Sequence, residues 1–315
     1  MEQNNWEKNI LQQLLFDTLK EQKASRRWRI FFRLIWIIII GAILYLIFSP
    51  SSDQFNITKN KNQVAIVNLS GTISGDTHVY ETVSEGLENA LKNKHVVAVI
   101  IKADSPGGSP VYSDMLYNKV LELRKKYPHK PIDVVVEEVC ASGCYYIAAA
   151  AHKIYAEPAS IVGSIGVIYT GFGVTGLMQK AGIDSRLLIS GKNKAMGYPF
   201  IPENKDQTVI QQSMLDEIHQ QFISAVEKGR GKILNTSDPE IFSGRYWIGQ
   251  DALKLGLIDG YSTVEKLARD VYHTDNLVDY TPDQDKIDRL LRKFGTDLVG
   301  EFKQTINKSN FGWIN

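Results

Sequence analysis

The order of apolar and polar positions predicts alternating strands and helices from residue 64 onward. Short apolar runs rich in β-branched residues indicate strands, and longer segments whose apolar residues recur every three or four positions indicate helices. We expect strands at 64–69, 96–101, 132–136, 153–156, 185–189 and 257–258, and helices at 80–93, 113–127, 178–182, 207–229, 250–255 and 264–271. This alternation predicts an α/β fold with a largely parallel sheet.

A different pattern marks the N-terminal region, where residues 30–49 carry a single charge at Arg33. The run is long enough for a transmembrane helix, which needs about 20 apolar residues. Because Arg26, Arg27 and Arg29 precede it, the positive-inside rule places residues 1–29 in the cytoplasm and the rest of the chain across the membrane. A cleaved signal peptide is the alternative, but no clear cleavage site follows.

The same pattern divides the chain into five parts. Residues 1–29 form an amphipathic segment, which either lies on the membrane or packs within an oligomer. The transmembrane helix at 30–49 and a polar linker at 50–62 follow. Residues 63–275 form one folded domain, and 276–315 a C-terminal helical tail.

Composition narrows the possible functions. The chain has 315 residues and a net charge of +1, which argues against a nucleic-acid binder that neutralises phosphates. Cys140 and Cys144 are its two cysteines. They make no disulfide framework, and if their segment is helical they lie one turn apart, so we expect two buried free thiols. No His or Cys cluster supplies metal ligands at usable spacing, and no cofactor is expected.

Ser142 is the candidate nucleophile, because it stands between an apolar strand and an Ala-rich segment that favours helix. Its base is open at this point. There is no G-x-S-x-G motif, and none of the six histidines lies in a recognisable motif, although spacing alone leaves a triad possible. A lysine whose pKa is lowered by burial is the other option. Lys192 and Lys194 follow the predicted strand at 185–189, where two lysines are more often solvated surface.

Pro106-Gly107-Gly108 supplies a second candidate feature. Two glycines after a proline let backbone N–H groups point into a cleft, which is how an oxyanion hole is built. An ordinary tight turn is the alternative.

Four motifs in order resemble the signal peptide peptidase A family (protease IV, the S49 serine peptidases). They are Ser105-Pro106-Gly107-Gly108, Ala141-Ser142-Gly143-x-Tyr145-Tyr146-Ile147-Ala148, Gly163-Ser164-Ile165-Gly166-Val167 and Ser190-Gly191-x-x-Lys194. Gly256-Leu257-Ile258-Asp259 resembles the family's closing segment, so the likeness covers about residues 62–275. The short, single-span form of the family is the closer likeness.

The resemblance implies a Clp-protease/crotonase-like fold of stacked ββα units. It implies a dyad of Ser142 as nucleophile and Lys194 as general base, with Ser164 orienting the lysine and Gly107 and Gly108 forming the oxyanion loop. It also implies a ring or dome homo-oligomer on the outer face of the bacterial cytoplasmic membrane, which degrades cleaved signal peptides at the lipid bilayer.

Two residues depart from the family's pattern. Cys144 replaces a usual Gly and adds a thiol near the site, and Asp104 replaces a frequent Asn and puts a charge near the oxyanion loop. Two other functions stay open. One is a catalytically silent scaffold that binds membrane-protein partners, and the other is a crotonase-type acyl-thioester enzyme, which would need neither Ser142 nor Lys194.

Overall fold

The computed structural model describes residues 26–41 and 62–282, which belong to two separate compact units. Residues 26–41 form a helix with exposed apolar side chains. Within the described residues, no helix is both long and apolar enough to cross a bilayer. The remainder of the predicted transmembrane helix, the segment before residue 26 and the tail after 282 lie outside the described residues, so those predictions stay predictions.

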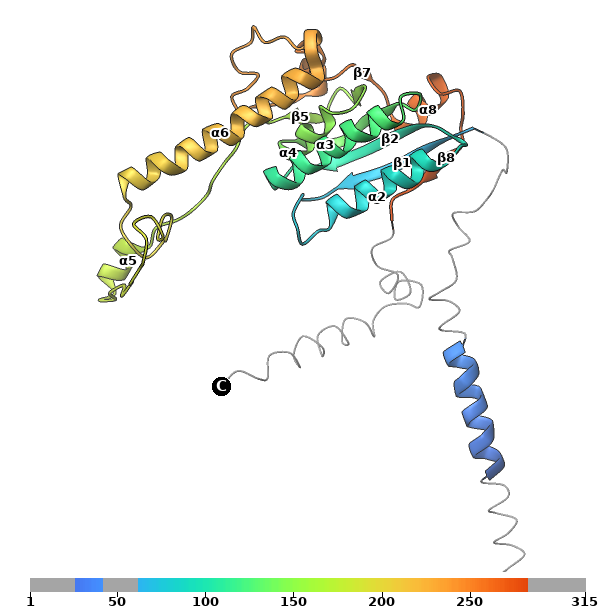
Figure 1. The fold of residues 1–315 in the computed structure, drawn as a ribbon, viewed down its shortest axis with the longest axis horizontal. Coiled ribbons are helices and arrows are strands. Elements are labelled where there is room, and N and C mark those ends of the chain that lie inside the picture. The colour runs from blue at the N-terminus through green and yellow to red at the C-terminus, as the bar shows by residue number, and fades with distance from the viewer. Residues whose placement is uncertain (1–25, 42–61, 283–315) are drawn as a thin grey trace, which may run out of the picture. The chain divides into compact units, whose positions relative to one another are not determined.

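Residues 62–282 build one mixed α/β sheet with the strand order β6-β5-β3-β2-β1-β8 (Figure 1). Off this path, β4 pairs with β3 and β7. All pairs are parallel except β5 with β6. The strands are β1 (Gln63–Ser70), β2 (Val96–Ser105), β3 (Ile132–Ala141), β4 (Ile154–Ala156), β5 (Ile161–Gly163), β6 (Tyr246–Ile248), β7 (Gly260–Tyr261) and β8 (Leu277–Asp279).

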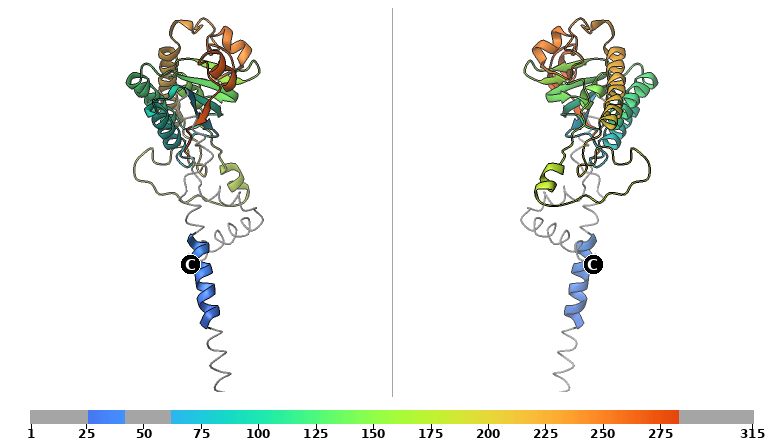
Figure 2. Two further views of the ribbon diagram at one scale, coloured as in Figure 1. Left: turned by 90° about the vertical axis from the view of Figure 1, so that its right-hand side faces the viewer. Right: turned by 90° about the vertical axis from the view of Figure 1, so that its left-hand side faces the viewer.

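Helices cover both faces of this sheet, as the two views of Figure 2 show. They are α2 (Val79–Lys92), α3 (Pro110–Lys126), α4 (Gly143–Ala148), α5 (Thr175–Lys180), α6 (Lys205–Arg230), α7 (Gly249–Lys254) and α8 (Val264–Asp270), with a 3-10 turn at Gly231–Ile233. Successive strand residues point to opposite faces. Accordingly Ala65, Val67 and Val99 belong to the core cluster under α2 and α3, whereas Val64 and Ile100 pack with α8.

Three predictions of local structure differ from the observed elements. Residues 257–258 are buried but form no strand, and the short strand is β7 at Gly260–Tyr261 instead. Residues 185–189 form no strand. Leu277–Asp279, assigned above to the tail, forms β8 beside β1, and the Tyr280 hydroxyl accepts hydrogen bonds from Gln63 and Asn93. The folded unit therefore extends to residue 282.

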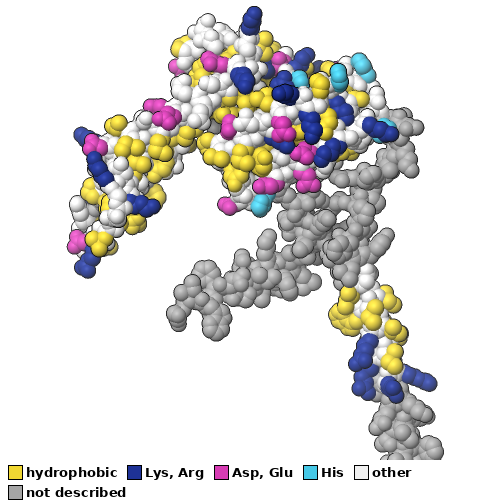
Figure 3. Space-filling model, in the orientation of Figure 1, with side chains coloured by type: hydrophobic (Ala, Val, Ile, Leu, Met, Phe, Trp, Pro, Cys, Tyr) yellow, Lys and Arg dark blue, Asp and Glu magenta, His cyan; other side chains and the backbone are white. Residues whose placement is uncertain are grey.

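Residues 166–204, which we call the arm, connect β5 to α6 and contain α5. In Figure 1 α5 lies beside the N-terminal end of α6, away from the sheet. The arm and the adjacent part of α6 expose many apolar side chains, and Figure 3 shows them interspersed with Lys and Arg. They include Ile168, Tyr169, Phe172, Leu177, Ile183, Leu188, Val209 and Met214. An isolated chain thus leaves apolar surface uncovered here.

Candidate active site

Ser142 occupies the turn between β3 and α4, with φ 53° and ψ −124°. Its N–H donates to the Gly163 carbonyl of β5 (2.8 Å), and its carbonyl accepts from the Tyr146 N–H (3.0 Å). A positive φ is costly for a residue with a Cβ, and such strained residues cluster at active sites. The turn holds Ser142 half-buried at the carboxyl end of its strand.

The glycine turn after β2 lies directly against Ser142. A Cβ on Gly107 would come within 2.8 Å of Ser142 Cβ and 2.6 Å of the Gly143 nitrogen, so only glycine fits. The Gly107 N–H donates to Ser105 Oγ (3.1 Å). The Gly108 nitrogen lies 3.2 Å from where a Cβ on Gly143 would stand. The Gly108 nitrogen therefore lies close to Gly143, the residue that follows Ser142.

Ser164 follows β5 and also has a positive φ, 52°. Its N–H donates to the Arg245 carbonyl beside β6 (2.9 Å). In the described part of the chain, the non-glycine residues with positive φ are His78, Ser142, Ser164 and His273. Two of these four are the serines that the sequence predicts for the site, and strained residues of this kind are typical of functional sites.

Ser142, Gly108, Gly143 and Ser164 line one cavity of about 600 Å³. Its wall has an apolar part, formed by Pro110, Tyr146, Val167, Ile168, Leu215, Ile218 and Phe222, and a polar part that includes Gln212, Asp216 and Ser243. Tyr146 stacks on Phe222 with ring centroids 4.8 Å apart, and its hydroxyl donates to Asp114 (2.9 Å). Burial, followed by the Asp114 carboxylate, raises the pKa of Tyr146, so the Tyr146 hydroxyl stays neutral.

His219 of α6 lines the same cavity and was missed by sequence reasoning. Its Nε2 lies 3.0 Å from the Ile165 carbonyl oxygen. No sequence motif surrounds His219. Its position depends on α6 crossing the carboxyl ends of β3 and β5, which is a tertiary feature.

Lys194 does not line this cavity, as far as the described residues define it. It is exposed on the arm, whose neighbouring Lys192 carbonyl accepts a hydrogen bond from Gln207. Gln207 and His219 are twelve residues apart on α6, or about 18 Å along the helix. Within one chain, therefore, the structure brings Ser142, Ser164 and the glycine turn together and leaves Lys194 apart.

The prediction of two free thiols is wrong, because Cys140 and Cys144 form a disulfide. Their Cα atoms are 5.1 Å apart, within the range that a disulfide spans. The prediction placed both residues on one helix. In the structure Cys140 is the last residue but one of β3, Cys144 is the second residue of α4, and the turn at Ser142 folds one toward the other.

Asp104 does not bring its charge into the oxyanion turn. Its Oδ1 accepts a hydrogen bond from the Val139 N–H (3.3 Å), where the register of β2 and β3 shifts. The carboxylate thus caps an irregular stretch of β3 that leads to Ser142. Among the described residues, no group of three or more His, Cys, Asp or Glu side chains could hold a metal ion.

Comparison with known proteins gives the following matches. A family model described as "Peptidase family S49" matches residues 124–277. A "Na(+)/H(+) antiporter NhaA" of Brucella abortus is 38% identical over 218 residues, 67% of this chain and 29% of that protein. A "Putative protease MJ0651" of Methanocaldococcus jannaschii is 35% identical over 245 residues, 73% of this chain and 76% of that protein. The chain thus spans less than a third of the antiporter and about three quarters of the archaeal protein.

Among solved structures, a variant of the 1510-N membrane-bound stomatin-specific protease in complex with a substrate peptide is similar. The match has a TM-score of 0.43 and 19% sequence identity, and covers 66% of this chain and 80% of that chain.

Proposed function

This chain belongs to peptidase family S49, and we propose that it is a membrane-anchored serine endopeptidase that uses a Ser142/Lys194 dyad. The observation that carries the proposal is the turn at Ser142. A serine is held there with positive φ at the rim of a cavity, beside the backbone nitrogens of two glycines. This is the arrangement that acyl transfer through a serine requires.

In the proposed reaction, neutral Lys194 takes the proton from Ser142 Oγ, and Oγ attacks the carbonyl carbon of the scissile peptide bond. The N–H groups of Gly108 and Gly143 donate to the resulting oxyanion, while Gly107 shapes the turn and uses its own N–H on Ser105. The C–N bond then breaks and the leaving amine takes the proton from Lys194. Water, deprotonated in the same way, hydrolyses the acyl-enzyme and restores Ser142.

Because Lys194 does not line the Ser142 cavity, we propose that a neighbouring copy supplies it. The exposed apolar residues of the arm support this, since association would cover them and carry Lys194 to the next subunit. Repeating such a head-to-tail contact closes a ring or dome, the assembly predicted for this chain. Ser164 would then orient the incoming lysine.

His219 is the alternative base, and it is favoured by one observation: it lines the cavity of Ser142 in the same chain. Its Nε2 is already close to the Ile165 carbonyl, which suits a residue that holds the β5 segment in place. We therefore assign the base to Lys194 and treat His219 as the competing candidate in the experiment below.

The proposed substrates are short apolar peptides, such as cleaved signal peptides, because Val167, Ile168 and Phe222 give the cavity an apolar side on which such a peptide could pack. We place the catalytic domain on the outer side of the bacterial cytoplasmic membrane, anchored through residues 30–49. The disulfide supports that placement, since disulfides persist in oxidising compartments. The parallel sheet with helices on both faces is compatible with the Clp-protease/crotonase-like fold of stacked ββα units.

The test is hydrolysis of a fluorogenic signal-peptide-like substrate by the full-length chain in detergent. We expect Ser142→Ala and Lys194→Ala each to lower kcat at least about a thousandfold, the order seen when a catalytic dyad is broken. Lys192→Ala is the matched control and should stay close to wild type. Wild-type rates in both dyad variants would refute the mechanism, and loss of activity in His219→Asn with retention in Lys194→Ala would move the base to His219.

Two further outcomes would change the class of protein. A fluorophosphonate that fails to label Ser142 in the folded, assembled protein would favour the silent scaffold. Binding of coenzyme A, with hydrolysis of an acyl thioester that survives Ser142→Ala, would favour the crotonase-type enzyme.

A further inference from the structure

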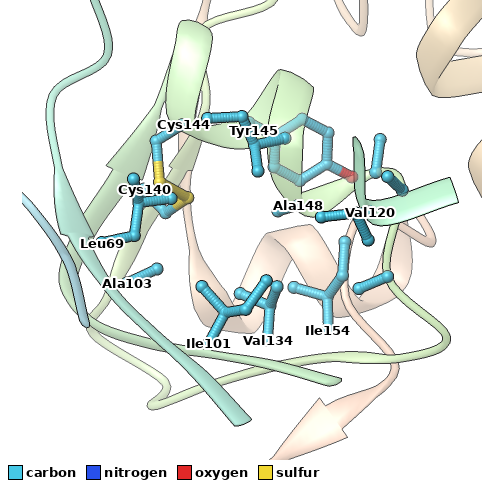
Figure 4. Packing of buried hydrophobic residues seen from close by; sticks show 14 of the residues in the cluster. Leu69, Ile101, Ala103, Val120, Val134, Cys140, Cys144, Tyr145, Ala148 and Ile154 are labelled. Carbon is cyan, nitrogen blue, oxygen red and sulfur yellow. A yellow bond between two sulfur atoms is a disulfide. The ribbon is translucent and has the colours of Figure 1, made fainter. Parts of the chain in front are cut away.

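The Cys140–Cys144 disulfide encloses the proposed nucleophile in a small covalent ring. The two cysteines are four residues apart in sequence, and Ser142 is the middle residue between them. Both cysteine side chains are fully buried, beside Leu69 and Ala103 of the two neighbouring strands (Figure 4). The bond therefore links the residues before and after the Ser142 turn, on the side of the turn that faces the core.

Each end of the ring is anchored in a different element. Cys140 pairs in the sheet with Ser105 of β2 and Val162 of β5. Cys144 lies in the first turn of α4, a helix of only six residues. Such a short helix has little stability of its own, so its first turn depends on tertiary contacts. The disulfide ties that turn covalently to the central strands.

The turn needs such a constraint because its conformation is unfavourable for serine. Ser142 has φ 53°, whereas the glycines around it adopt positive φ without a clash with a Cβ. A relaxed turn would move Ser142 Oγ and the Gly143 nitrogen together, because they belong to consecutive residues. It would also separate the Gly143 nitrogen from that of Gly108.

We propose that the Cys140–Cys144 disulfide is a positioning element for catalysis, which holds Ser142 and the Gly143 N–H in the geometry that the reaction uses. This inference rests on the proposed peptidase function. The bond acts through the turn and does not touch the substrate, so its loss should lower kcat and leave KM nearly unchanged. A bond that served folding alone would leave both constants of the folded enzyme unchanged.

The experiment compares oxidised and reduced wild-type protein, which differ only in this bond. Because both sulfurs are buried, the chain is unfolded in urea with a trialkylphosphine and refolded with the phosphine present. One water supplies the phosphine oxide oxygen and the two thiol hydrogens, while the disulfide takes two electrons from phosphorus. A parallel sample passes through the same steps without phosphine, and the thiol count is checked by alkylation and mass spectrometry.

We expect the reduced protein to have a kcat about tenfold lower than the oxidised sample, with KM within about twofold, the order that releasing a strained residue would cause. Reoxidation should restore kcat. The double variant Cys140→Ala/Cys144→Ala should have the same low kcat with and without phosphine, which controls for effects of the reductant elsewhere. An unchanged kcat in reduced, folded wild type would overturn the proposal.

Amide hydrogen exchange separates failure of this inference from failure of the proposed function. The Tyr146 N–H, which is bonded to the Ser142 carbonyl, should exchange at least about tenfold faster in the reduced protein, while β1 is unaffected. If the oxidised protein hydrolyses no peptide, the proposed function fails and the exchange result still decides whether the bond holds the turn. Equal exchange rates of the Tyr146 N–H in the oxidised and reduced proteins would refute the positioning role of the disulfide, whatever the activity.

Discussion

At the scale of single residues, the site depends on the close approach of two backbone turns. We predict that Gly107→Ala lowers kcat/KM at least about a hundredfold, because the added methyl group would displace the Gly143 N–H, one of the two proposed oxyanion donors. A methyl group there would overlap Ser142 Cβ and the Gly143 nitrogen, and φ is +97° at this position. Steady-state kinetics on the peptide substrate measure this loss.

Gly71→Ala is the matched control for Gly107→Ala. Gly71 also has a positive φ (+74°), but a Cβ there would meet no atom within 4 Å. The control should therefore lose about 1–2 kcal/mol of unfolding free energy through backbone strain alone and keep its kcat/KM. Equal losses of activity in the two variants would mean that the effect is general destabilisation, and the proximity argument would be wrong.

His152 allows a pH prediction at the same scale. Its Nε2 accepts from Arg124 (3.3 Å), and its Nδ1 lies 3.0 Å from the Ile132 nitrogen and 3.2 Å from the Ile132 carbonyl oxygen. Because Nε2 needs a lone pair to accept from Arg124, the neutral ring is the form that fits. Burial, followed by the Arg124 charge, lowers the pKa of His152 below its ordinary value of 6.5. Between the pKa of His152 in the folded protein and the ordinary value in the unfolded chain, the unfolded chain binds more protons than the folded protein. The free energy of unfolding therefore falls as the pH falls through this window.

The measurement is urea unfolding of the folded domain at pH 7.5 and pH 5.5, for wild type and His152→Gln. We expect wild type to lose more stability than the variant on acidification, because Gln has no proton to gain. If both proteins show the same dependence on pH, His152 does not contribute in the way argued.

At the scale of elements, the strands and helices with strong local patterns could be predicted from the sequence. β1, α2, α6 and α8 agree with their apolar periodicity within a few residues. β8 could not be predicted, because three residues carry little pattern and become a strand only through pairing with β1. The strand predicted at Leu257 and Ile258 is absent for the opposite reason. These two residues are apolar and buried, but they have no partner strand.

The candidate site was predictable as far as it is built from the ends of parallel strands. Ser105 ends β2, Ala141 ends β3 and Gly163 ends β5, and these strands are neighbours, so the motifs that follow them meet at one edge of the sheet. The disulfide was not predictable, because it depends on the turn at Ser142. If residues 140–150 are taken as one helix, that turn is absent and the two thiols do not meet. His219 was missed for a similar reason, since only the crossing of α6 brings it to the cavity.

At the scale of the whole molecule, the proposed assignment of the base to Lys194, which lies apart from the Ser142 cavity, makes oligomerisation a condition for activity. If the lysine comes from a neighbour, then Ser142→Ala and Lys194→Ala subunits complement each other in a mixed assembly. Co-expression of the two inactive full-length variants should restore about a quarter of the wild-type activity per site, because in a head-to-tail ring one pairing in four joins an intact serine to an intact lysine. Separate affinity tags on the two variants allow the mixed assemblies to be isolated for the assay.

The matched control for this complementation replaces the Lys194→Ala subunit by one that carries both substitutions. That mixture contains no intact serine and should stay inactive at every ratio. A Ser142→Ala and Lys194→Ala mixture that is assembled, verified by both tags and still inactive would show that serine and lysine must lie in one chain. In that case the arm would have to fold back about 18 Å along α6 to reach its own cavity, and the apolar surface that it exposes would need a different occupant.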